Sequence, residues 1–146
     1  MVILDKLAAK TAQRIIDERG NNTEKSTLDG LSTKTIGVLQ EQGVYAAVLF
    51  LLSRFGSEQF AKVLMSNLLR LLNEDEVAAI GAAFPLSAGE VVSPDWVAQK
   101  KERVLKHFAD GTTGSDGIAT NLQRLLVVRS LFEQTLIYVR YGAKAL

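Results

Sequence analysis

Apolar residues recur at helical spacing through the last part of the chain, residues 118–146. The recurring positions are Leu125, Val128, Leu131, Phe132, Leu136, Val139, Ala143 and Leu146. Steps of four and eleven residues nearly complete whole helical turns. Four charged residues therefore share one narrow arc, and they are Arg129, Glu133, Arg140 and Lys144. The pattern predicts a long C-terminal helix that buries most of its surface and exposes a basic strip.

Similar spacing predicts the other helices, and it leaves no convincing strand alternation. The predicted ranges are 3–19, 27–42, 44–54, 58–72 and 94–109, with a short helix over 74–83. Residues 44–54 are apolar nearly all round, which predicts a helix buried in the centre of a bundle. We therefore expect an all-α fold, a compact bundle of about six helices that forms a single domain over residues 1–146.

Local signals mark where several of these helices begin and end. Gly43 ends one helix, and Ser57 and Asn73 each stand where they can cap the next. Ser93, followed by a proline, is a strong helix start. Residues 110–117 (DGTTGSDG) are predicted to be the most flexible segment.

The net charge of +1 conceals an uneven distribution along the 146 residues. Residues 57–93 carry two Lys/Arg and five Asp/Glu, a net charge of −3. Residues 118–146 carry four Lys/Arg and one Glu, a net charge of +3. Opposite patches of this kind favour head-to-tail self-association, with the acidic block at residues 74–76 meeting the basic C-terminal helix of another copy.

The sequence offers little for catalysis. It contains no cysteine, which excludes disulfides and thiol nucleophiles. His107 is the only histidine, and we expect it at the surface because metal and acid–base sites need convergent partners. No hydrolase, P-loop or metal-binding motif is present. We therefore predict that the protein is not an enzyme and that it holds no cofactor and no metal.

Basic residues are spaced along helix faces. Lys6, Lys10 and Arg14 form a ridge opposite the apolar side of the first helix. A second face combines an aromatic side chain with basic ones, namely Trp96, Lys100, Arg103, Lys106 and His107. Such faces suit phosphate contacts and stacking on a base. They equally suit a solvated surface on which Trp96 covers the edge of the core and lysine stems lie over it.

Two stretches resemble the small, all-helical subunit of type III-B CRISPR effector (Cmr) complexes. One is residues 33–54, TKTIGVLQEQGVYAAVLFLLSR, which has a lysine-containing helix, a Gln-x-Gly break and an apolar helix with Phe50. The other is the chain end, residues 137–146, IYVRYGAKAL. The first helix, LAAKTAQRII, is a weaker match. The chain departs from the family at Gly37, where a proline is frequent, and throughout residues 57–117.

The resemblance implies a compact helical bundle without nuclease activity. It implies copies stacked in a short filament beside guide-bearing backbone subunits, in contact with guide RNA and target RNA. The basic residues that match the family are Lys10 or Arg14, Lys34, Arg54 and Arg140. Together with the basic positions on the predicted helix faces, the candidate RNA-binding residues are Lys6, Lys10, Arg14, Lys34, Arg54, Arg129, Arg140 and Lys144.

Other functions stay open at this point. The chain could be the equivalent small subunit of a type III-A complex, a helical adaptor or dimerisation module with no nucleic-acid role, or an enzyme subunit completed by a partner. The longest apolar run, Val44 to Leu52, is far shorter than a membrane span, and the N-terminus has no signal-peptide pattern. We therefore expect a soluble, cytoplasmic protein with no membrane partner.

Overall fold

The computed structural model describes residues 2–19, 24–109, 111–112 and 115–146. Within these ranges the protein is almost entirely helical, which confirms the predicted all-α class. The helices are α1 (Val2–Asp17), α2 (Lys25–Gln42), α3 (Val44–Ser53), α4 (Gln59–Leu72), α5 (Asp75–Ala78), α6 (Pro94–Gln99), α7 (Lys101–Phe108), the 3-10 turn η1 (Ile118–Thr120) and α8 (Leu122–Lys144). One cluster of buried side chains includes residues from every one of them.

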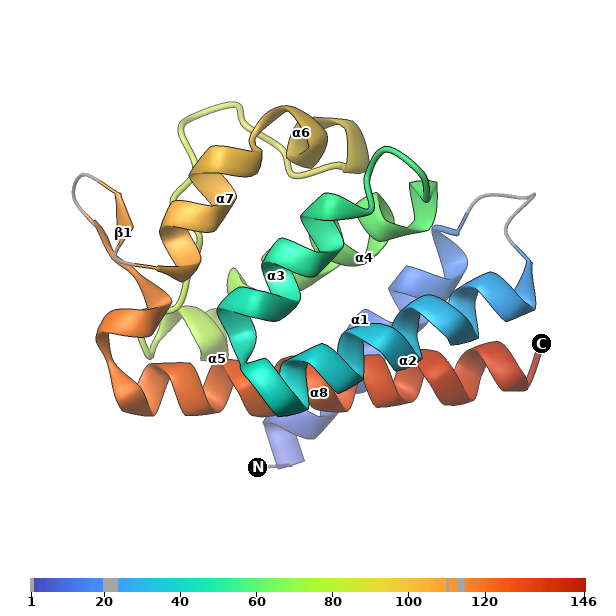
Figure 1. Ribbon diagram of the computed structural model, residues 1–146. Helices are drawn as coiled ribbons and strands as arrows, with labels where there is room; N and C mark the ends of the chain where they lie inside the picture. The colour runs from blue at the N-terminus through green and yellow to red at the C-terminus, as the bar shows by residue number, and fades with distance from the viewer. Residues whose placement is uncertain (1, 20–23, 110, 113–114) are drawn as a thin grey trace.

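The long C-terminal helix α8 organises the bundle. It runs along one edge of the molecule, with α2 beside it and α1 packed against it (Figure 1). Its buried stripe is the predicted one from Val128 to Ala143. Leu146, which was predicted to belong to that stripe, lies beyond the end of α8 and is 53% exposed. In the described part of the chain, no helix is both long enough and apolar enough to cross a membrane.

The apolar run over residues 44–54 predicted that α3 is the central helix, and this prediction is wrong. The central helix is α4. Eleven of the fourteen residues of α4 are buried, because α1, α3 and α6 all pack against it. In contrast, α3 leaves Tyr45 and Leu49 43% and 47% exposed. The two buried polar residues of α4, Ser66 and Asn67, are tolerated because each donates a hydrogen bond to the Val63 carbonyl.

Several predicted helix boundaries are wrong in detail. The helix predicted over residues 94–109 is broken at Lys100, which separates α6 from α7. The short helix predicted to reach residue 83 ends at Ala78. Ser93 caps α6 as predicted, by accepting a hydrogen bond from the Trp96 backbone N–H. Ser57 does not cap α4, since its hydroxyl donates to the Arg54 carbonyl instead.

The segment between α7 and η1 differs from the expectation of no strand. Two-residue strands β1 (Gly111–Thr112) and β2 (Ser115–Asp116) pair antiparallel there. The prediction of flexibility also covers residues 110, 113 and 114, which lie outside the described residues. The predicted start of the last helix at residue 118 is four residues early, because Asn121 caps α8 by accepting from the Arg124 backbone N–H.

The prediction that His107 lies at the surface is wrong. Its side chain is fully buried between the rings of Phe84 and Phe108, and its Nε2 lies 3.0 Å from the Ala82 carbonyl oxygen. The physical reason is the loop after α5, which places the Ala82 carbonyl and the Phe84 ring against the His107 side chain. Burial lowers the pKa of His107, the main cause being desolvation of the charged ring.

Candidate nucleic-acid interface

The basic ridge of α1 is exposed at one end and enclosed at the other. Lys6 and Lys10 are exposed, and Lys10 Nζ lies 3.5 Å from a carboxylate oxygen of Glu74. Arg14 turns inward instead, and its Nε donates a 2.6 Å hydrogen bond to Asn67 Oδ1 on α4. Lys6 and Lys10 of the predicted ridge are therefore accessible at the surface, with Lys10 paired to Glu74, whereas Arg14 is held inward.

On α8 the basic strip lies beside α2, which runs antiparallel to it. Arg129 donates to the Gln40 carbonyl near the end of α2, at 2.9 Å. Arg140 Nε lies 3.4 Å from Asp29 Oδ1 near the start of α2. Lys144 is exposed and, among the described residues, has no carboxylate within ion-pair distance. The two arginines thus tie the helices together, while Lys144 reaches solvent.

The two remaining candidates stand on α2 and at the end of α3. Lys34 is exposed on the outer side of α2, and no acidic side chain of the described residues pairs with it. Arg54 follows the last turn of α3, and its guanidinium carbon lies 5.0 Å from the centroid of the Phe50 ring. That distance is typical of a cation–π contact, which holds the Arg54 side chain against α3.

The candidate residues form separate groups. Lys10 and Arg14 contact residues of α4 and of the turn before α5, whereas Arg129 and Arg140 contact α2. These contacts divide the four residues between two places in the fold, α1 with α4 and the turn before α5, and α8 with α2. Residues 7–16, 33–54 and 137–146 lie on α1, on α2 and α3, and on α8, respectively, and both α1 and α2 pack on α8.

The face around Trp96 is an internal polar network. Arg103 donates from both terminal nitrogens to the two carboxylate oxygens of Glu90, at 2.8 and 2.9 Å, and also donates to the Pro85 carbonyl. The Trp96 indole N–H donates to the same carboxylate at 3.2 Å. Glu90 is a loop residue with no periodic signal, so sequence reasoning missed it. Its interactions favour the interpretation that Trp96 covers the edge of the core.

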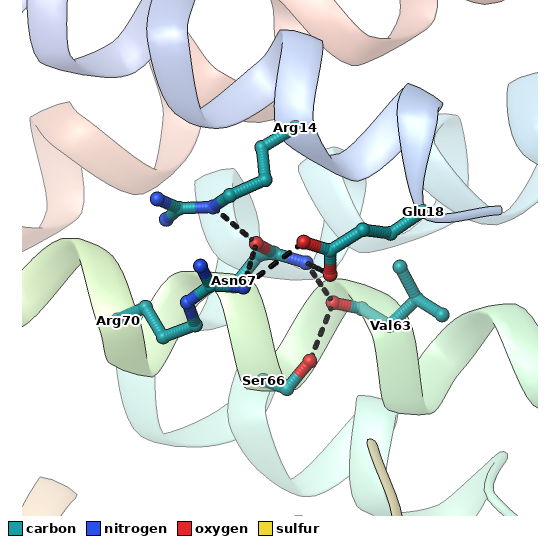
Figure 2. Close-up of polar contacts among 6 residues, drawn as sticks. All are labelled: Arg14, Glu18, Val63, Ser66, Asn67 and Arg70. Atoms are coloured by element: carbon teal, nitrogen blue, oxygen red, sulfur yellow. Dashed lines mark hydrogen bonds and ion pairs between the residues drawn. The ribbon is translucent and has the colours of Figure 1, made fainter. Parts of the chain in front are cut away.

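A second network, also missed by sequence reasoning, joins α1 to α4 (Figure 2). Asn67 accepts from Arg14, and its amide donates to Glu18 Oε1 at 3.1 Å. Arg70 donates to Glu18 Oε2 at 3.0 Å and makes a longer, 3.4 Å contact with Asn67 Oδ1. The signal in the sequence was Asn67 itself, a polar side chain on the apolar stripe of a leucine-rich helix. A buried amide at such a position needs hydrogen-bond partners from neighbouring residues.

No protein-family model, no curated protein and no solved structure matches this chain.

Proposed function

We propose that this protein is a non-catalytic, RNA-binding structural subunit of a type III-B CRISPR effector complex and that it works in the cytoplasm. In this role it stacks with further copies beside the backbone subunits and contacts the phosphates of guide RNA and target RNA. Base pairing between the two RNAs then reads the sequence, and the protein supplies positioning contacts.

One observation supports this proposal above the others. The segments that resemble the family are far apart in sequence, at residues 7–16, 33–54 and 137–146, yet α1, α2 and α8 form one packed unit. Each of these three helices has an exposed lysine, namely Lys10, Lys34 and Lys144, respectively. Phosphate contacts require basic side chains that are both exposed and held on a rigid scaffold, and these lysines meet that requirement.

The test reverses the exposed lysines and leaves the engaged arginines alone. The RNA variant changes Lys6, Lys10, Lys34 and Lys144 to Glu. The matched control changes four lysines outside the proposed interface to Glu, and these are Lys62, Lys100, Lys101 and Lys106. Both variants alter the net charge by the same amount, so a general loss of attraction to RNA affects both equally.

We expect the RNA variant to lose retention of single-stranded RNA, in the assembled complex, much more than the control. Its salt dependence should also flatten, by a slope of roughly 0.7 for each lost single-strand contact. Melting temperatures should stay close to wild type for both, since exposed charges contribute at most about 1 kcal/mol each. Equal RNA binding by wild type and both variants would contradict the proposal and favour a helical adaptor with no nucleic-acid role.

A further inference from the structure

Two residues of the network in Figure 2 border an open groove of about 500 Å³. Arg14 of α1 and Arg70 of α4 line it, together with Glu74, and the loop before α6 closes the other side with Leu86, Glu90 and Val91. The free ends of the two guanidinium groups lie on the same side of Asn67 (Figure 2). Two donors with fixed geometry therefore face one space.

The carboxylates around the groove are already engaged. Glu90 is held by Arg103 and Trp96, and Glu74 is paired with Lys10. Glu18 is the remaining carboxylate, and it faces two guanidinium groups, those of Arg14 and Arg70. The groups that line the network thus leave one positive charge uncompensated.

Arg14 also has an unused donor. Its Nη2 is enclosed by protein and has no hydrogen-bond partner, although its Nε is bound to Asn67. An enclosed N–H without a partner costs free energy, and because Nη2 has almost no accessible surface, an acceptor reaches it only when the end of the Arg14 side chain turns toward the groove. The pKa of Arg14 is lowered, first by burial and then by the positive charge of Arg70, while Glu18 and Glu74 act in the opposite direction.

We propose that this groove binds a phosphate group between the guanidinium groups of Arg14 and Arg70. A phosphate supplies several acceptor oxygens, and arginine binds such oxygens with paired N–H groups. Its negative charge compensates the excess positive charge and relieves the repulsion between the two arginines. We infer that the phosphate belongs to the backbone of a bound RNA, and this part of the inference alone rests on the proposed function.

The test follows the side-chain Nε–Hε signals of Arg14 and Arg70 by NMR during a titration with inorganic phosphate. Ionic strength is held constant with chloride, so that screening does not change. We expect both signals to shift and to saturate in the wild-type protein. Arg70→Gln should weaken binding by at least about tenfold, the effect of losing one charge-assisted hydrogen bond. Lys62→Gln, on the same helix but outside the groove, should bind as the wild type does.

The wild-type titration decides the matter even if Arg70→Gln fails to fold. A separate titration with sodium chloride is the control. Equal shifts of the two signals with chloride and with phosphate would overturn the proposal, and so would wild-type phosphate binding by a folded Arg70→Gln variant. A parallel titration with oligouridine tests the source, because an RNA phosphate should shift the same two signals. A shift with inorganic phosphate alone would support the site and contradict RNA as its source. If the fourfold lysine variant binds RNA as the wild type does while the wild type shows the phosphate shifts, the failure lies with the proposed RNA interface and not with this groove.

Discussion

Arg103 binds both carboxylate oxygens of Glu90, and this pairing connects α7 to the loop that precedes α6. The guanidinium group also lies over two aromatic rings, with its central carbon 5.2 Å from the Phe84 centroid and 5.6 Å from the Trp96 centroid. A basic residue that the sequence places on an RNA-binding face is thus committed to the protein's own structure.

We predict that Glu90→Gln destabilises the protein and removes a component of its acid sensitivity. The hydrogen bonds from Arg103, followed by that from the Ser87 backbone, lower the pKa of Glu90 from 4.5 to about 2. The unfolded state therefore binds a proton more readily, and the stabilisation present at neutral pH is lost as pH falls from about 4.5 toward 2. Urea unfolding at pH 7 and pH 3 measures both effects. An unchanged midpoint at pH 7 would contradict the prediction.

His107 provides a second pH dependence, at higher pH. Burial lowers its pKa from the ordinary 6.5, so the unfolded state binds more protons in the interval below 6.5. Stability should therefore fall as pH drops from 7.5 to 5.5. His107 is the only histidine, and ordinary carboxyl groups titrate below this interval. In His107→Gln the slope over this interval should disappear, as judged by urea unfolding; a variant with the wild-type slope would show that His107 is not responsible.

The helical periodicity of the sequence was sufficient to predict the fold class and the buried stripe of α8. It could not predict that α4, and not α3, is central, because burial depends on which other helices cover a given one. Tyr45 and Leu49 are apolar and yet exposed, since few residues of other helices lie over that side of α3. Propensity and period describe one helix at a time, and coverage is a property of the assembled bundle.

The candidate site was less accessible to sequence reasoning. Spacing identified Arg14 as basic and surface-directed, but its partner Asn67 lies 53 residues away on α4. Arg103 is likewise engaged by Glu90, which belongs to a loop. Whether an arginine is free or paired depends on such long-range contacts, which carry no periodic signal in either segment.

A pair of glycine variants should separate helix propensity from packing. Both Gly37 in α2 and Gly142 in α8 are helical, and alanine is favoured over glycine by up to about 1 kcal/mol at such positions. A Cβ at Gly37 meets nothing within 4 Å, whereas one at Gly142 would overlap with the Ile16 side chain of α1. We expect Gly37→Ala to stabilise the protein. Gly142→Ala should be less stable than Gly37→Ala by roughly 1–3 kcal/mol, the usual cost of overpacking. Equal stabilities in urea unfolding would show that α1 yields freely at this contact.

The buried stripe of α8 can be tested with a charge. Leu136 is 1% exposed, and Leu126 on the same helix is 50% exposed. Leu136→Asp places an unpaired carboxylate in the core, so we expect loss of the cooperative unfolding transition. Leu126→Asp introduces the same charge at the surface and should shift the melting temperature little. Circular dichroism of the two variants makes the comparison, and a folded Leu136→Asp would contradict the assignment of the stripe.

We predict that copies of the protein associate head to tail through surfaces of opposite charge. Asp75 and Glu76 are exposed at the start of α5, and Lys144 is exposed at the end of α8. A contact between one copy's acidic turn and the next copy's C-terminal helix uses two different surfaces, so it builds an open filament and not a closed dimer. Sedimentation at high protein concentration should show assembly that weakens as salt rises, because exposed charge pairs are screened.

Charge exchange tests which surfaces meet in that filament. Asp75→Lys with Glu76→Lys should abolish assembly, and Lys144→Glu alone should weaken it. Mixing the acidic-turn variant with the Lys144→Glu variant places opposite charges across both contacts of an alternating assembly, so the mixture should form filaments again although neither variant does so fully alone. The control Asp95→Lys changes an exposed carboxylate at the start of α6 and should leave assembly intact. Assembly that persists in the acidic-turn variant would contradict the proposed contact, because like charges facing each other disfavour association.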